Sequence, residues 1–188
     1  MGAAAGTRVI LAGFMGTGKT EVGRRLAQSL GWSFVDTDAL VESAAGRSVA
    51  AIFADEGEAA FRARERDAVE QACAMTAAVV AVGGGALLDP ENRRRLLAAG
   101  PVVCLRASPE ELMRRLGPAR DRPLLNGDGR ASTEERRARI EALLAERAPV
   151  YALATHAVDT DGLSPDEVAV RVRAILGAIL GKQSGGAA

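Results

Sequence analysis

Cysteine and histidine are almost absent from this sequence, which has two cysteines and one histidine among 188 residues. Cys73, Cys104 and His156 lack the CxxC or HxxxH spacing of a zinc site, and two cysteines are too few for a disulfide framework. We therefore expect a protein of the reducing cytoplasm, in which both cysteines are small buried hydrophobic residues. We expect His156 to be an ordinary strand residue.

Net charge and long apolar runs are also missing. The 24 basic residues balance the 24 acidic residues, so no overall field would draw the protein to nucleic acid or to an anionic membrane. The longest run of apolar and glycine residues, 77–88, is shorter than the roughly 20 residues of a membrane-spanning helix. We therefore expect neither nucleic acid nor a membrane as a partner. A length of 188 residues fits a single domain over 1–188, which we expect to be a monomer.

Short apolar runs alternate with segments that have helical spacing. The runs are bounded by glycine or proline and predict buried strands. The expected strands are 8–12, 33–36, 78–82, 101–105 and 156–159. The expected helices are one that ends at Gly31 and others over about 38–46, 48–56, 58–76, 89–99, 108–116, 132–148 and 164–180. This alternation predicts an α/β fold with a five-stranded parallel sheet flanked by helices on both faces.

Lysine is scarce, since 22 of the 24 basic residues are arginine and only Lys19 and Lys182 are lysine. Lys19 stands in GFMGTGKT, residues 13–20, which matches the pattern G-x-x-x-x-G-K-[ST] between a predicted strand and a predicted helix. In such a P-loop the backbone N–H groups and the helix N-terminus bind phosphate, the lysine contacts the β- and γ-phosphates, and the Thr20 hydroxyl binds Mg²⁺. A glycine-rich turn with a surface lysine is the alternative.

Two carboxylates follow the second predicted strand. Asp36 and Asp38 are expected at the carboxyl edge of the sheet, where α/β proteins bind ligands. In an extended chain their side chains would face opposite ways, Asp36 toward the water shell of Mg²⁺ and Asp38 toward a substrate hydroxyl. The alternative is that Asp36 only ends the strand and Asp38 caps the next helix.

Three further features have both a functional and a structural interpretation. Arg62 lies in a charged helical stretch, where Arg64 and Arg66 are expected on a solvated face with i,i+3 and i,i+4 ion pairs. Glycines 83–85 would allow a ligand to approach the main chain, or they form a plain turn. Arg147 is near the predicted end of a helix, where it could also interact with the helix dipole.

One segment interrupts the alternation of strands and helices. Residues 117–129 contain prolines, glycines and arginines between two predicted helices, which is typical of a mobile lid. Arg122 within it could reach a transferring phosphoryl group when the lid closes. Residues 182–188 are expected to be a disordered tail.

Taken together, the motifs resemble those of the shikimate kinase family. The resemblance covers about residues 8–176, and it rests on GFMGTGKT (13–20), DTD (36–38), EGEAAFRARE (56–65), GGG (83–85), RPLL (122–125) and ERAPVY (146–151). It implies a three-layer P-loop kinase fold with a lid and a substrate-binding helical part at about 37–62. The implied reaction is Mg²⁺-dependent transfer of a phosphoryl group from ATP to the 3-hydroxyl of shikimate, which gives shikimate 3-phosphate and ADP.

The resemblance also implies site residues. Those on the nucleotide side would be Gly16, Thr17, Gly18, Lys19, Thr20, Glu21, Arg115, Arg122 and Pro165. Those around shikimate would be Asp38, Phe53, Phe61, Arg62, Gly83, Gly84, Gly85 and Arg147. Mg²⁺ would be held directly by Thr20 and through water by Asp36, and the catalytic residues would be Lys19, Asp38 and Arg122.

Two other functions use the same phosphate loop. A different small-molecule kinase, acting on gluconate or a nucleoside monophosphate, would share the loop and the lid. A GTP-binding switch would also share the loop, but it usually needs an Asn-Lys-x-Asp motif, and neither lysine in this sequence follows an asparagine. The order of the motifs favours the shikimate kinase family over both.

Overall fold

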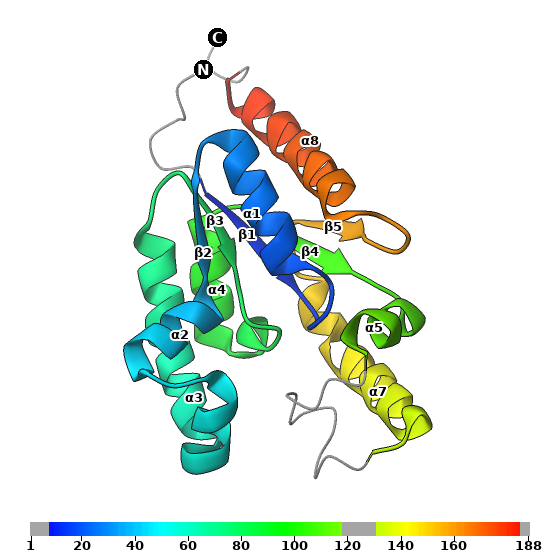
Figure 1. The fold of residues 1–188 in the computed structure, drawn as a ribbon. Coiled ribbons are helices and arrows are strands. Elements are labelled where there is room, and N and C mark those ends of the chain that lie inside the picture. The colour runs from blue at the N-terminus through cyan, green and yellow to red at the C-terminus, as the bar shows by residue number, and fades with distance from the viewer. Residues whose placement is uncertain (1–7, 118–130, 185–188) are drawn as a thin grey trace.

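The computed structural model describes residues 8–117 and 131–184. Five parallel strands form one sheet in the order β2-β3-β1-β4-β5 (Figure 1). The strands are β1 (Arg8–Gly13), β2 (Ser33–Asp36), β3 (Ala78–Ala81), β4 (Val102–Arg106) and β5 (His156–Asp159). The predicted α/β class and the five parallel strands are confirmed, with strand ends displaced by one residue at β1, β3 and β4.

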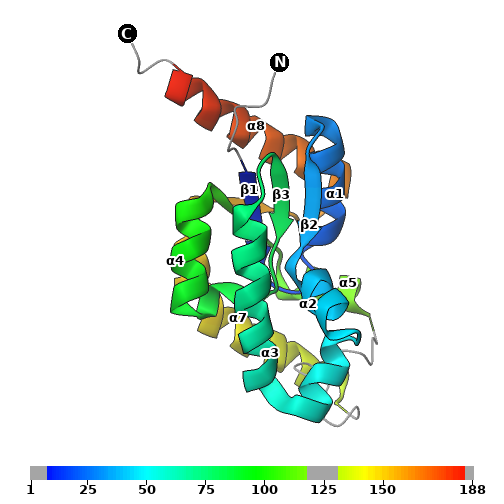
Figure 2. The same ribbon diagram turned by 90° about the vertical axis from the view of Figure 1, so that its left-hand side faces the viewer.

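Helices cover both faces of this sheet. On one side lie α1 (Lys19–Leu30) and α8 (Pro165–Ser184), and on the other lie α3 (Val49–Ala74), α4 (Pro90–Ala99) and α7 (Thr133–Tyr151), as Figure 2 shows. The short elements α2 (Thr37–Ala45), η1 (Ala86–Leu88) and α5 (Pro109–Leu116) follow β2, β3 and β4. No helix in the described ranges is long and apolar enough to cross a membrane.

The core consists of two apolar layers, one on each face of the sheet. Leu11 of β1 packs in a cluster with Val22 of α1 and Val172 of α8. Its neighbour Ile10 packs on the opposite face with residues of α3 and α4, such as Leu96. Because successive side chains of a strand point to opposite faces, a strand covered on both faces is apolar at every position. This explains the continuous apolar runs of the sequence.

Two helices differ from the predicted boundaries. α7 continues through Pro149 to Tyr151, whereas the sequence predicted an end at 148, so Arg147 does not lie in the last turn. α8 continues to Ser184, so residues 182–184, expected in the tail, are helical. In contrast, the predicted break between 56 and 58 is present inside α3, where Gly57 has φ 81° and ψ 176°. The predicted lid, except Gly117, and Arg122 lie outside the described residues, as do residues 185–188 of the expected tail.

Candidate active site

The candidate site lies where β1, β2 and β3 end. Because the strands are parallel, the phosphate loop after β1, Asp36 at the end of β2 and glycines 83–85 after β3 all meet at one edge of the sheet (Figure 1). The β-strand registers Asp36↔Ala81 and Leu11↔Ala81 place the three strand ends side by side. Residues that are far apart in the sequence therefore form a single site.

The phosphate loop occupies the turn between β1 and α1. Gly16 and Gly18 have φ of 83° and 91°, which L side chains rarely adopt, and Gly18 is the N-cap of α1. The Lys19 ammonium donates to the carbonyl oxygens of Gly13 at 2.8 Å and Phe14 at 3.0 Å. Lys19 thus lies across a loop from which a helix begins, and both the ammonium and the helix N-terminus favour an anion there. This geometry supports a P-loop over a plain turn.

Asp36 joins the phosphate loop to the second helix. Its Oδ2 accepts the Thr20 hydroxyl at 2.8 Å, and its Oδ1 accepts the Asp38 N–H at 3.1 Å. Asp36 is therefore the N-cap of α2, and the alternative in which Asp38 caps this helix is wrong. The expectation that both residues are extended is also wrong, because α2 begins at Thr37 and Asp38 lies in its first turn.

The described residues contain no cluster of three or more histidine, cysteine or acidic side chains that could hold a metal by itself. Thr20 and Asp36 instead offer one hydroxyl and one carboxylate beside the phosphate loop. Mg²⁺ prefers oxygen ligands and is usually held by one or two protein groups together with substrate phosphates and water. This pair therefore fits Mg²⁺ that arrives with a nucleotide.

Asp38 points into the protein, toward the glycines after β3. Its Oδ1 is buried without a hydrogen-bond partner among the described residues, and it lies 2.8 Å from the position that a Cβ would take at Gly83. Burial raises the pKa of the Asp38 carboxyl, and the charge of Asp36 raises it further, while Lys19 and Arg62 act in the opposite direction. The carboxylate is thus placed to accept a hydrogen bond from a ligand hydroxyl.

Arg62 is held by two carboxylates of its own helix. Its Nη1 donates to Glu65 at 2.6 Å, and its Nε and Nη2 donate to Glu58 at 3.2 and 3.0 Å. Glu65 is fully buried, and burial raises its pKa while Arg62 lowers it. Sequence reasoning did not single out either acid, although the i,i+3 and i,i+4 spacings were a usable signal. Arg62 also lies over the Phe61 ring, 5.3 Å from its centroid.

The neighbouring side chains of α3 fall into two groups. The Phe53 and Phe61 rings contact each other, with 4.7 Å between centroids, and they lie in an apolar cluster between α2 and α3. Arg64 and Arg66 pair with Glu56 and Asp89, respectively, at 2.8 Å. The expected ion pairs of these two arginines are present, but the expected i,i+3 and i,i+4 spacing is wrong, because the partners lie eight and 23 positions away.

Arg147 is buried, with 3% of its surface exposed. Its guanidinium lies 5.3 Å from the centroid of the Phe14 ring, its Nη1 donates to the Gly84 carbonyl at 3.3 Å, and its Nε has no partner in the described parts of the chain. A residue that only offset the helix dipole would lie in the last turn at the surface, so that alternative is not supported.

Glycines 83–85 pass between the two arginines. A Cβ on Gly85 would come within 2.7 Å of Arg62 Nη2, and a Cβ on Gly84 would lie 3.6 Å from Arg147 Nη1. The absence of side chains at these positions allows both guanidinium groups to approach the same piece of main chain. The geometry therefore supports a ligand-binding segment with two cations beside it.

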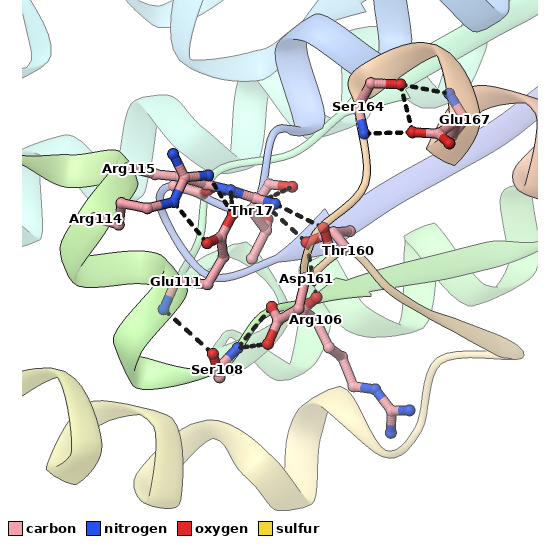
Figure 3. A network of polar contacts seen from close by, with 11 residues as sticks. Thr17, Arg106, Ser108, Glu111, Arg114, Arg115, Thr160, Asp161, Ser164 and Glu167 are labelled. Atoms are coloured by element: carbon pink, nitrogen blue, oxygen red, sulfur yellow. Dashed lines mark hydrogen bonds and ion pairs between the residues drawn. The ribbon is translucent and has the colours of Figure 1, made fainter.

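Arg115 of α5 belongs to a separate network on the far side of the phosphate loop (Figure 3). It donates to the Thr160 hydroxyl at 3.0 Å and the Thr160 carbonyl at 2.7 Å, and it contacts the Gly16 and Thr17 carbonyls at 3.4 Å. Glu111 pairs with it at 2.7 Å. Thr160 and Glu111 were not singled out from the sequence, because neither belongs to a recognisable motif.

Pro165 and Glu21, both expected on the nucleotide side, lie at the beginnings of helices. Pro165 is the first residue of α8, which the chain enters from Thr160 through Ser164 (Figure 3). Glu21 lies in the first turn of α1 and pairs with Arg25 at 2.7 Å. Of the other residues noted in the sequence, His156 begins β5 as expected, Cys104 is buried, and Cys73 is only partly buried; both cysteines are free.

The sheet order, the phosphate loop and the charged side chains beside glycines 83–85 are those of a P-loop kinase of small molecules. Comparison with known proteins gives the particular family: residues 15–176 match the family model for shikimate kinase. The chain is 43% identical to shikimate kinase of Caldanaerobacter subterraneus subsp. tengcongensis, over 87% of this chain and 92% of that protein. It is 49% identical to shikimate kinase of Frankia casuarinae, over 92% of this chain and 73% of that one. The chain belongs to the shikimate kinase family.

Solved structures give the same result. The chain superposes on shikimate kinase from Acinetobacter baumannii in complex with shikimate with a TM-score of 0.83 and 35% identity, covering 93% of each chain. The TM-score is 0.84, at 31% identity, with shikimate kinase from Bacteroides thetaiotaomicron, over 93% of this chain and 99% of that one. A gluconokinase from Sinorhizobium meliloti gives 0.56 at 19% identity, over 95% and 98%, which indicates a shared fold alone.

Proposed function

We propose that this member of the shikimate kinase family transfers the γ-phosphoryl group of ATP, with Mg²⁺, to the 3-hydroxyl of shikimate. The observation that carries the proposal is Arg147, a buried guanidinium with no ion pair among the described residues. A buried charge without a counter-ion is costly, so such a site favours an anionic ligand. The carboxylate of shikimate is an anion of suitable size and geometry for this position.

The other residues of the site suit the same substrate. Arg62 supplies a second guanidinium beside Gly85, and the fork geometry of guanidinium matches a carboxylate better than ammonium does. Asp38 supplies a buried acceptor for the ring hydroxyl that attacks the phosphoryl group. Phe53 and Phe61 would form an apolar wall on the α3 side. Asp38 would orient the hydroxyl and accept its proton as the new bond forms.

On the nucleotide side, the phosphate loop would bind the phosphates through its N–H groups and Lys19. Thr20 would bind Mg²⁺ directly and Asp36 would bind it through water, since the two side chains are already in contact. The metal would neutralise charge on the β- and γ-phosphate oxygens. Arg115 and Pro165 would flank the base, and Arg122 would contact the γ-phosphate from the lid. This last role rests on the family resemblance.

The proposal includes a monomer in the cytoplasm. The free state of Cys73 and Cys104 agrees with a reducing compartment. Kinases of gluconate or nucleoside monophosphates are not favoured, because residues 15–176 match the shikimate kinase model and shikimate kinases superpose with TM-scores of 0.83 and 0.84, against 0.56 for the gluconokinase.

The test is Mg²⁺-dependent release of ADP from ATP in the presence of shikimate. Parallel reactions contain gluconate, a nucleoside monophosphate or no acceptor, and the product is checked as a phosphate monoester of shikimate. Turnover with shikimate alone supports the proposal. Turnover with another acceptor, or hydrolysis that needs no acceptor, would reject shikimate as the substrate. The assignment of residues 13–20 as a phosphate-binding loop would still stand.

A further inference from the structure

Two side chains of α7 donate to the same backbone oxygen. The Tyr151 hydroxyl donates to the Gly84 carbonyl at 2.6 Å, and Arg147 Nη1 donates to it at 3.3 Å. The two residues are four positions apart in a helix, so their side chains lie on the same face. A carbonyl oxygen has two lone pairs and can accept both bonds, and the distances identify Tyr151 as the principal donor.

The Tyr151 hydroxyl keeps its proton under all ordinary conditions. Burial raises the pKa of Tyr151 to about 12, an effect that Arg147 reduces and Cys104 increases. The hydroxyl therefore stays protonated near neutral pH, where it can donate to the Gly84 carbonyl.

The Gly84 carbonyl determines the direction of a neighbouring N–H group. The peptide between Gly84 and Gly85 is planar and trans, so its N–H points opposite to its carbonyl. Gly85 in turn lies against the Arg62 guanidinium, because a Cβ placed on Gly85 would be only 2.7 Å from Arg62 Nη2. The Gly83 N–H donates to the Thr37 hydroxyl, and the Gly83 and Gly85 carbonyls accept backbone N–H groups of the following turn. The Gly84 carbonyl accepts instead from α7, so these contacts hold the peptide that glycine itself leaves free.

We propose that Tyr151 is a positioning residue for substrate binding, whose hydroxyl holds the Gly84 carbonyl, and with it the peptide between Gly84 and Gly85, so that the Arg147 guanidinium remains available to the substrate carboxylate. This inference rests on the proposed function. Without the hydroxyl, Arg147 becomes the remaining donor to Gly84 and is drawn toward the main chain. The glycine segment also regains freedom that substrate binding must then remove.

The test is Tyr151→Phe, which removes only the hydroxyl. We expect the KM for shikimate to rise about five- to tenfold, as for loss of one buried hydrogen bond, with kcat and the KM for ATP within about twofold of wild type. An unchanged KM for shikimate would overturn the proposal. Wild-type protein is assayed first, and absence of turnover with shikimate would reject the proposed function before any variant is compared.

Thr155→Val is the matched control. Thr155 lines the same cavity of about 580 Å³ as Tyr151, and its hydroxyl donates to the Val102 carbonyl at 2.8 Å, away from the glycines. This variant also loses a hydroxyl and should lower the melting temperature, but its KM for shikimate should stay within about twofold of wild type. An equal rise of the KM for shikimate in both variants would assign the effect to a general loss of stability and overturn the proposal.

A second measurement keeps the test decisive if Tyr151→Phe does not fold. The chain contains one tyrosine, so biosynthetic incorporation of a ring-fluorinated tyrosine changes residue 151 alone and makes its phenol more acidic. Deprotonation then removes the donor and pairs the phenolate with Arg147. We expect the KM for shikimate to rise at alkaline pH in the fluorinated protein and not in wild type. The same pH profile in both proteins would overturn the proposal.

Discussion

Thr20 donates its hydroxyl to Asp36 Oδ2 at 2.8 Å, which joins the first turn of α1 to the N-cap of α2. This contact places the two oxygen atoms proposed for Mg²⁺ side by side. The preorganised pair should lower the cost of binding the metal–nucleotide complex.

Asp36→Asn tests this pair. Asparagine is also a good N-cap, so we expect thermal stability to change little, while the loss of charge should raise the Mg²⁺ concentration for half-maximal activity by about tenfold. The measurement is a Mg²⁺ titration of initial rate at constant ATP. An unchanged Mg²⁺ requirement would restrict Asp36 to capping α2.

Asp38→Asn should separate chemistry from nucleotide binding. The amide cannot take the proton of the attacking hydroxyl, so we expect kcat to fall by about 10²- to 10⁴-fold. The affinity for ADP with Mg²⁺, measured by calorimetry, should stay within about twofold of wild type. Equal loss of turnover and nucleotide affinity would instead assign Asp38 to folding or to the metal.

Gly83→Ala should damage the acceptor side of the site. The new Cβ would lie 2.8 Å from both Asp38 Oδ1 and Glu65 Oε1, so both carboxylates must move away from it. We expect kcat/KM for shikimate to fall by about tenfold or more, with ADP affinity retained. Gly177→Ala in α8 is the control: nothing lies within 4 Å of its Cβ, and it should be neutral or stabilising by about 0.5–1 kcal/mol. Wild-type kinetics in the Gly83 variant would show that both acids can move without consequence.

Glu111→Gln should show a stability difference that depends on pH. Hydrogen bonds from Arg114, followed by those from Arg115, lower the pKa of Glu111 from 4.5 to about 2, so the ionised carboxylate stabilises the folded state above pH 4.5. This contribution is lost as the pH falls from 4.5 toward 2. At pH 7 we expect the melting temperature of the variant to be roughly a few degrees below that of wild type.

The difference in melting temperature between wild type and Glu111→Gln should close progressively between pH 4.5 and 2. A difference that is the same at pH 7 and pH 3 would show that the ion pairs with Arg114 and Arg115 are not its cause. The variant should also raise the KM for ATP more than the KM for shikimate, because Arg115 contacts the phosphate loop.

The sequence alone determined the elements, the α/β class, the phosphate loop and the family. These properties depend on local pattern: an apolar run bounded by glycine, a helical repeat, or a motif such as residues 13–20. Even the break at Gly57 could be predicted, since a single residue with positive φ causes it. Such features need no knowledge of distant contacts.

Only the tertiary structure decided how the side chains are partnered. The sequence could not show that the Thr20 hydroxyl donates to Asp36, that Asp38 faces Gly83, or that Tyr151 reaches Gly84. Each of these depends on a chain direction or on an approach between residues up to 67 positions apart. Local propensity carries no information about such contacts, because packing across the parallel sheet brings the residues together.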